Sequence, residues 1–280
     1  MDGRWRIKEF AGRTGVPEAT LRAWERRYAL LDPTRSPGGY RLYSPADERR
    51  VVSMQAHMGR GVAAAEAALL ARSETSPADV PADPRELADE LLTAVVAFDA
   101  GRADALLEGA LRLGPGPAIR DVLMPALHEL GDRWERGDAT VAHEHFATHL
   151  VERRLMQQAA GWEHGTGGLA LLACPSGERH TLPLLCFGIA LAEHGWRVAY
   201  LGADTPLRNV ADAADSLAPA VVVLATTHAS RLTDNATAIE ALATRHRTLV
   251  AGAGATATVA RRLRVDRLEG DPVSAAASLT

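Results

Sequence analysis

Three observations on the sequence predict a multidomain α and α/β protein. Residues 1–60 carry 12 Arg and Lys against 7 Asp and Glu, whereas the remaining residues carry 19 against 28, so a basic head precedes an acidic body. From residue 86 to about residue 162, apolar residues recur with the period of a helix. From Leu169 onward, short apolar runs alternate with helical segments. We therefore expect a small helical head that meets a polyanion, a four-helix bundle and a parallel β-sheet.

The composition is that of an ordinary globular protein, with 47% hydrophobic and 24% charged residues. No apolar run approaches the roughly 18–20 residues that span a bilayer, and the N-terminus lacks an apolar signal core, so we expect a cytoplasmic protein. The two cysteines, Cys174 and Cys186, fit a reducing compartment, and Cys174 is expected to pack rather than react. The sequence contains no Ser/His/Asp triad, Walker loop or cysteine-rich zinc pattern, so it does not predict an enzyme.

The first segment begins with two short helices. Ile7–Thr14 is amphipathic and is closed by Gly15. Pro17 then occupies a first-turn position, where its missing N–H costs nothing. Leu21 and Trp24 form the apolar side of the second helix, and Trp24 is expected in the core. Two short helices joined by a glycine turn are typical of a helix-turn-helix.

A two-stranded wing is predicted after the helices, which completes an N-terminal winged helix-turn-helix. Residues 35–43 place a Pro-Gly-Gly turn between short extended pieces. Ser44 and Pro45 then start another helix as its N-cap and first residue. Side chains of the second helix and the wing are free to meet phosphates or base edges. The candidate DNA-binding residues are Thr20, Arg22, Arg26, Tyr40, Arg41 and Tyr43.

Residues 15–28 (GVPEATLRAWERRY) and 39–43 (GYRLY) resemble the winged-helix DNA-binding domain of the MerR family of transcriptional regulators. The resemblance implies a dimer on a pseudo-palindromic operator in double-stranded DNA, with the second helix in the major groove and the wing on the backbone. We expect residues 1–72 to form this domain. Residues 73–85, rich in proline and small polar residues, are expected to form a semi-rigid linker.

Residues 86–165 are expected to form the four-helix bundle. Helices are predicted from residue 86, at Ala105–Leu113, at Ile119–Arg136 and from Val141 to about Ala160. The apolar stripe of the first helix holds Leu87, Leu91, Val95 and Phe98. The last two helices meet around a single turn, which gathers Trp134, Glu144 and His145 at one end of the bundle.

Residues 166–280 are expected to form a Rossmann-like, doubly wound parallel sheet. The predicted strands are Leu169–Cys174, Trp196–Leu201, Ala220–Thr226, Thr248–Gly254 and a weak one near Arg267–Glu269. The loop after the first strand carries Glu178 and His180 at the carboxyl end of the sheet, where ligands bind in open α/β folds. An imidazole with a carboxylate two residues earlier is arranged like a metal ligand with the group that orients it.

The bundle and the sheet together resemble the cobalamin-binding module shared by methionine synthase and the CarH/LitR photoreceptors. Glu178 and His180 match that module's acidic-x-His-x-x-Gly loop, with Pro183 where the family has glycine. The resemblance implies that His180 is the lower axial ligand of cobalt, displacing the cofactor's own dimethylbenzimidazole. It also implies that the nucleotide tail runs beside small and hydroxyl-bearing residues, namely Gly177, Thr226, Thr227, Gly252 and Gly254.

The bundle carries the Trp-x(9)-Glu-His spacing of the CarH type in Trp134, Glu144 and His145. The resemblance implies that these residues shelter the 5′-deoxyadenosyl group of adenosylcobalamin. In such photoreceptors light breaks the cobalt–carbon bond, the tetramer dissociates and DNA is released. The histidine that captures cobalt after photolysis in the well-studied type is replaced here by Glu135, so a bis-histidine photoproduct through that position is not expected.

The sequence therefore predicts a cobalamin-dependent, light-responsive transcriptional repressor that binds DNA as a dimer or tetramer. Two alternatives keep the regulator but change the signal: cobalamin sensed without photochemistry, or another tetrapyrrole such as a linear bilin. A corrinoid methyl-carrier protein would fit the bundle and sheet, but it has no use for a DNA-binding head. A MerR-type regulator whose effector domain binds no cofactor is the remaining alternative.

Overall fold

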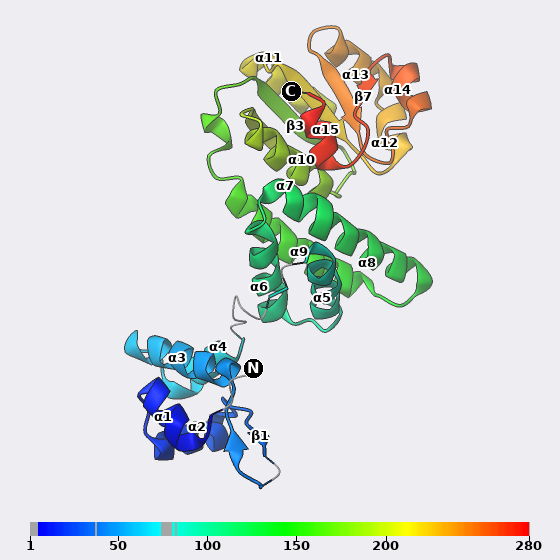
Figure 1. The fold of residues 1–280 in the computed structure, drawn as a ribbon. Helices are drawn as coiled ribbons and strands as arrows, with labels where there is room; N and C mark the ends of the chain where they lie inside the picture. The colour runs from blue at the N-terminus through cyan, green and yellow to red at the C-terminus, as the bar shows by residue number, and fades with distance from the viewer. Residues whose placement is uncertain (1–4, 37, 74–79, 82, 280) are drawn as a thin grey trace. The chain divides into compact units, whose positions relative to one another are not determined.

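The computed structural model describes residues 5–36, 38–73, 80–81 and 83–279 (Figure 1). The chain divides into two compact units, one of Met1–Ala82 with Asp99–Gly109 and one of Asp83–Phe98 with Ala110–Thr280. Of the predicted linker 73–85, residues 74–79 and 82 lie outside the described residues. Its last part is helical, because Asp83 caps a helix that starts at Pro84 and accepts hydrogen bonds from two backbone N–H groups of the first turn.

The head of the first unit contains the predicted helix-turn-helix and wing. Its elements are α1 (Ile7–Thr14), α2 (Glu18–Tyr28), β1 (Thr34–Arg35), β2 (Arg41–Leu42), α3 (Pro45–Gly59) and α4 (Ala64–Ser73). Gly15 ends α1 in the left-handed conformation, with φ of 69°. Ser44 and Asp47 form a capping box at the start of α3. The core of the head is formed by Phe10, Leu21, Trp24, Tyr43 and Met54, among others.

The helical bundle lies between the head and the sheet in sequence. Its helices are α5 (Pro84–Val96), α6 (Ala100–Leu111), α7 (Pro115–Pro117), the π-helix η2 (Ala118–Leu123), α8 (Met124–Arg136) and α9 (Val141–Gln158). Within the second unit, α5 packs against η2, α8 and α9. Phe98, expected in the apolar stripe of the first helix, is instead half exposed beyond the end of α5. Its positive φ of 53° turns the chain there, and its ring stacks on His143 of α9.

The C-terminal part of the second unit is a five-stranded parallel sheet with order β4-β3-β5-β6-β7, as a doubly wound fold requires. The strands are β3 (Leu169–Pro175), β4 (Arg197–Thr205), β5 (Val221–Ala225), β6 (Thr248–Ala251) and β7 (Asp266–Arg267). The helices are α10 (Leu182–Glu193), α11 (Leu207–Leu217), α12 (Ala229–Thr233), α13 (Ala236–Ala243), α14 (Ala257–Leu263) and α15 (Pro272–Ala277). A short 3₁₀ turn, η3 (Trp162–His164), connects α9 to the sheet. The Rossmann-like prediction is therefore confirmed.

The sheet is buried on both faces. Leu171, Val222, Leu224 and Val250 pack in one cluster with residues from α11 to α14, whereas α10 and α15 contact each other and carry the opposite layer. Among the described residues, no helix is both long enough and apolar enough to cross a bilayer.

Candidate functional site

The strand order places a topological switch point at the carboxyl ends of β3 and β5. The chain leaves β3 toward β4 on one side, whereas β5 pairs with β3 on the other, and this is the switch point at which open α/β sheets bind ligands. The loop after β3 carries Glu178 and His180, and the loop after β5 carries Thr226, Thr227 and His228. The structure brings these two loops together.

The carboxylate of Glu178 joins the two loops. It is 2% exposed. Its Oε1 accepts a hydrogen bond from the backbone N–H of His180 at 2.9 Å and lies 2.6 Å from His180 Nδ1. Its Oε2 accepts from the hydroxyl of Thr226 at 2.9 Å and from the backbone N–H and hydroxyl of Thr227 at 2.6 and 2.8 Å. Both oxygens of this buried group are therefore fully engaged.

These hydrogen bonds decide the charge of Glu178. Burial alone raises the pKa of its carboxyl group, but donors outweigh it: the backbone N–H groups of His180 and Thr227, then the Thr227 hydroxyl and the His180 ring. Together they lower the pKa of Glu178 to about 2. The group is thus an ionised carboxylate at neutral pH, and it can only accept hydrogen bonds.

An anionic acceptor at Glu178 fixes the tautomer of His180. Its Nδ1 carries the proton and donates to Oε1, which leaves Nε2 with a bare lone pair. The His180 side chain is 59% exposed, so this nitrogen is available to a ligand. Among the described residues, no group of three or more His, Cys, Asp or Glu side chains is placed to hold a metal ion. A single oriented imidazole suits a metal that brings its other ligands with it, as cobalt in a corrin does.

The conformation of the loop after β3 depends on Gly177, which the sequence indicated, and on Asp204, which it did not. Gly177 is left-handed, with φ of 80°, and its N–H donates to Asp204 Oδ1 at 2.7 Å. The backbone N–H of Asp204 donates in turn to the carbonyl of Glu178 at 2.9 Å. A methyl group on Gly177 would overlap the guanidinium of Arg231. Asp204 lies at the end of β4, and only the folded sheet brings it to this loop.

Gly252 and Gly254 were predicted to line a slot for the cofactor's tail, and their observed close approach is to the chain itself. A Cβ on Gly252, whose φ is 88°, would overlap the carbonyl oxygen of Thr226, and one on Gly254 would overlap the backbone of His228. The N–H of Gly254 also donates to the Thr226 carbonyl at 3.0 Å. These glycines press the loop after β6 onto the loop after β5, and thereby position Thr226 and Thr227.

The bundle residues Trp134, Glu144 and His145 lie around the turn between α8 and α9. Trp134 is 53% exposed near the end of α8. Glu144 and His145 are in the first turn of α9, with His145 Nε2 3.5 Å from Glu144 Oε2 and the Thr148 hydroxyl donating to Glu144 Oε1 at 3.2 Å. Within the described residues, no hydrogen bond, ion pair or ring contact joins these three side chains to His180.

The conformation of the turn between α8 and α9 is determined by the capping residues of the two helices. Gly137 ends α8 in the left-handed conformation, and Thr140 caps α9 in a reciprocal capping box with His143. His143 Nδ1 accepts the backbone N–H of Thr140 at 2.9 Å. Glu144 therefore sits where the positive end of the helix dipole favours a carboxylate.

In the head, four of the predicted DNA-binding side chains are exposed and Thr20 is half-buried. Arg22 pairs loosely with Glu18 at 3.5 Å, and Arg26 lies on the same helix. Tyr40 is exposed on the wing beneath the guanidinium of Arg6. Arg41 Nε lies 2.9 Å from Glu25 Oε1, an ion pair that connects the wing to α2.

Tyr43 is a correction to the predicted DNA-binding set. Its side chain is 0% exposed, and its ring stacks on Phe10 with centroids 4.6 Å apart. Its hydroxyl donates to Glu25 Oε2 at 3.0 Å, and burial, followed by this bond, raises the pKa of Tyr43 well above its ordinary value, so it stays neutral. Its backbone pairs with that of Trp5. Tyr43 therefore holds the wing against the core and does not face DNA.

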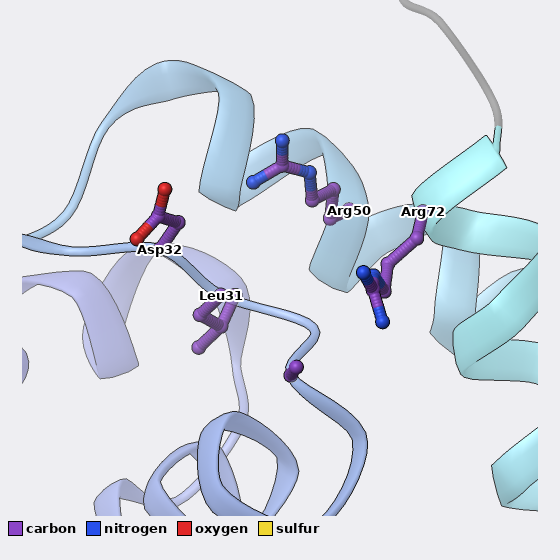
Figure 2. Close-up of a pocket in the computed structure, with 5 residues that line it drawn as sticks. Leu31, Asp32, Arg50 and Arg72 are labelled. Carbon is purple, nitrogen blue, oxygen red and sulfur yellow. The ribbon is translucent and has the colours of Figure 1, made fainter.

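The head carries a pocket of about 350 Å³, lined by Ala29, Leu31, Asp32, Arg50 and Arg72. Figure 2 shows four of these residues, Leu31, Asp32, Arg50 and Arg72, around it. Both arginines already have partners in the chain. Arg50 Nη1 lies 3.3 Å from the buried carboxylate of Asp47, and Arg72 Nη1 donates to the carbonyl of Tyr28 at 3.4 Å. The pocket holds none of the predicted DNA-binding residues.

Comparison with family models identifies three segments of the chain. Residues 5–74 match the MerR HTH family regulatory protein. Residues 87–157 and residues 168–277 each match a B12 binding domain. The first of these covers the bundle, and the second covers the sheet with the Glu178–His180 loop.

Two characterised relatives match most of the chain. It is 38% identical to the HTH-type transcriptional repressor CarA of Myxococcus xanthus over 225 residues, covering 78% of this chain and 75% of CarA. It is 34% identical to the HTH-type transcriptional repressor CarH of the same organism over 234 residues, covering 79% of this chain and 78% of CarH. A solved structure, the monomethylamine corrinoid protein of Methanosarcina barkeri, shares the fold with a TM-score of 0.60 at 17% identity, covering 69% of this chain and 97% of that one.

The head thus matches a family of DNA-binding regulators, and the bundle and the sheet each match a B12 binding domain. A DNA-binding head on two B12-binding domains makes this protein a cobalamin-binding transcriptional regulator and not an enzyme. The chain belongs to the family of HTH-type transcriptional repressors that includes CarA and CarH.

Proposed function

We propose that the protein represses transcription as an oligomer on operator DNA while it holds adenosylcobalamin through His180, and that light ends the repression. The observation that carries the cobalamin part is the pairing of Glu178 with His180. A buried, ionised carboxylate holds the imidazole in one tautomer, with Nε2 bare and accessible. When bound, the cofactor supplies a cobalt–carbon bond that visible light can break.

The residues of the two loops fit such a cofactor. They offer one nitrogen donor, which suits a metal whose macrocycle already supplies its other ligands. Thr226 and Thr227, with Gly177, Gly252 and Gly254 beneath and beside them, are proposed to flank the nucleotide tail. Residues 166–280 are thus the proposed cobalamin domain, and residues 86–165 are the proposed cap over its upper face.

Light sensing is proposed for the residues around the turn between α8 and α9 of the bundle. Trp134 and His145 are exposed around one turn, with Glu144 half-buried there, and an exposed tryptophan near a carboxylate and an imidazole is a surface suited to a ligand. We propose that they cover the adenosyl group. Glu135, also exposed, stands next to Trp134, and a carboxylate is a poor ligand for cobalt compared with imidazole.

DNA recognition is proposed for the accessible side chains of α2 and the wing, of which Thr20 is half-buried and the others are exposed. Arg22, Arg26 and Arg41 supply cationic donors for phosphates or guanine edges, and Thr20 and Tyr40 supply hydroxyls. Residues 1–72 are the proposed DNA-binding domain, and a dimer or tetramer would place two such domains on a pseudo-palindromic site.

The test begins with protein loaded with adenosylcobalamin in the dark. An operator is first selected from a library of random duplexes, and binding to it is measured before and after green light, together with the oligomer size in solution. We expect tight binding by a larger assembly in the dark, and weaker binding by a smaller one after illumination. Protein loaded with hydroxocobalamin, which has no cobalt–carbon bond to break, is the matched control.

Two results would contradict the proposal at different points. Equal DNA binding and equal oligomer size in darkness and light would remove light sensing and leave cobalamin sensing without photochemistry. A His180→Ala variant that retains cobalamin with the wild-type spectrum would remove the assignment of the lower ligand.

A further inference from the structure

A second histidine, His228, lies beside His180 at the carboxyl ends of the strands. The rings of His180 and His228 are 23° from parallel, with centroids 6.5 Å apart. His228 follows β5 directly after Thr227, and its ring is exposed. The backbone of His228 is fixed from two sides, because its N–H donates to the Thr226 hydroxyl at 3.2 Å and Gly254 packs against it. The ring can therefore be changed without moving the loop.

The contact between His228 and the rest of the site is the hydroxyl of Thr227. Thr227 Oγ1 lies 2.8 Å from Glu178 Oε2, 2.8 Å from His228 Nδ1 and 3.3 Å from His180 Nδ1. A hydroxyl has one proton to donate, whereas its oxygen accepts through two lone pairs. The direction of each bond in the network follows from this count.

Each oxygen of Glu178 already accepts a backbone N–H, Oε1 from His180 at 2.9 Å and Oε2 from Thr227 at 2.6 Å, so both act as acceptors and the hydroxyl proton of Thr227 points to Oε2. The His180 ring spends its own N–H on Oε1 at 2.6 Å. The remaining contact, at 2.8 Å, then requires that His228 Nδ1 carry a proton and donate to the Thr227 oxygen. Hydrogen bonds are therefore donated in one direction, from His228 to Thr227 and from Thr227 to Glu178.

We propose that His228 is a positioning residue for the cobalt ligand: by donating to Thr227 it holds that hydroxyl in the rotamer that donates to Glu178, and Glu178 in turn sets the tautomer and direction of His180. This inference rests on the proposed role of His180. It adds a residue from the next strand of the sheet, at the end of a hydrogen-bonded series that starts in solvent and ends at the ligand. Outer partners of this kind change metal affinity although they never touch the metal.

The experiment uses the full chain and cobinamide, a corrin that lacks the nucleotide base, so that any axial nitrogen must come from the protein. Binding is followed by absorbance, and nitrogen coupling to cobalt is read from the electron paramagnetic resonance spectrum of the reduced Co(II) form. The variants are His228→Ala, His228→Asn, Thr227→Ala and the double variant Thr227→Ala/His228→Ala. His194→Ala, which removes an exposed histidine at the end of α10, is the matched control.

We expect His228→Ala to bind cobinamide about tenfold more weakly, at the lower end of the range for outer-partner losses, and to show a weakened nitrogen coupling. His228→Asn should stay close to wild type, because its amide N–H can replace the Nδ1 donor. His194→Ala should match wild type. In the Thr227→Ala background, the His228→Ala change should have little further effect, since the hydroxyl through which His228 acts is already absent.

Wild-type affinity and coupling in His228→Ala would overturn the inference, as would a loss that persists in full in the Thr227→Ala background. Failure of the asparagine variant to recover binding would also count against it. Failure of the proposed function looks different: wild-type protein would then show no nitrogen coupling at all, or His180→Ala would retain it.

Discussion

At the scale of single residues, the site depends on a charge that the fold keeps out of water. Burying a carboxylate is costly unless donors replace the solvent. At Glu178 they come from both loops, as two backbone N–H groups, two hydroxyls and a ring N–H. The same bonds therefore stabilise the switch point of the sheet and orient the imidazole of His180.

Glu178→Gln tests both roles at once. The amide has nearly the same shape, but its NH2 group would replace one of the accepting oxygens of Glu178. The NH2 group would then face hydrogen-bond donors, and those donors would be left without an acceptor. We expect the free energy of unfolding to fall by about 1–3 kcal/mol and cobalamin affinity to fall about 10–100-fold. Chemical denaturation and absorbance titration measure these effects. Glu163→Gln, at an exposed glutamate of η3, is the control and should change neither. Unaltered affinity in Glu178→Gln would mean that the imidazole is oriented by something else.

The low pKa of Glu178 also predicts a pH dependence. Its value falls from 4.5 to about 2 on folding. A carboxyl group whose pKa is lowered stabilises the folded state above the unfolded value, and this contribution is lost as the pH falls from about 4.5 toward 2. The contribution at neutral pH is on the order of 3 kcal/mol. Urea unfolding of wild type and Glu178→Gln between pH 6 and pH 3 should therefore converge at the acidic end, whereas a constant gap would contradict the assignment.

At the scale of elements, local pattern predicted most of the fold. The predicted bounds of α1 agree with the structure, because apolar spacing and the closing Gly15 determine them within the segment. The π-turn in η2 and the extension of β4 to Thr205 were missed. Such features depend on the neighbours against which a segment packs.

The candidate site divides in the same way. Glu178 and His180 could be found from the sequence because both lie in one loop, with the carboxylate two residues before the imidazole that it orients. His228, Asp204 and Arg231 could not, because they come from other strands and loops and reach the site through strand order and register. Tyr43 was misassigned for a related reason: its place in the wing indicates DNA, whereas its burial depends on the packing of Phe10.

Gly252 provides a test of the loop after β6. In Gly252→Ala the new methyl group would meet the carbonyl of Thr226, and the residue would also carry a positive φ. Gly195→Ala separates the two effects, because Gly195 has a φ of 83° but open space around its Cβ position. We expect Gly195→Ala to cost about 1–2 kcal/mol from backbone strain alone. Gly252→Ala should cost more and should also weaken cobalamin binding. Equal losses of stability, with cobalamin binding intact, would mean that the loop yields without disturbing Thr226.

At the scale of the whole molecule, the basic and acidic parts of the chain predict that DNA binding and cobalamin binding can be impaired separately. Arg22→Ala should weaken operator binding by about 1–3 kcal/mol and leave cobalamin uptake unchanged. Titrations at two salt concentrations would show whether Arg22 contacts phosphate, since the salt dependence then decreases. Arg262→Ala, at an exposed arginine of the second unit, is the control. Wild-type DNA affinity in Arg22→Ala would place the reading face elsewhere on α2.

The double contact of Glu25 has a consequence for how this family could be re-engineered. One of its oxygens pairs with Arg41 and the other accepts from Tyr43, so α2 and the wing are fastened to each other through a single side chain. A chimera that imports only the recognition helix of another regulator would leave the wing unanchored, unless the donor helix also brings an acid at that position. Helix α2 and the wing should therefore be transplanted together, and we expect them to change together in evolution.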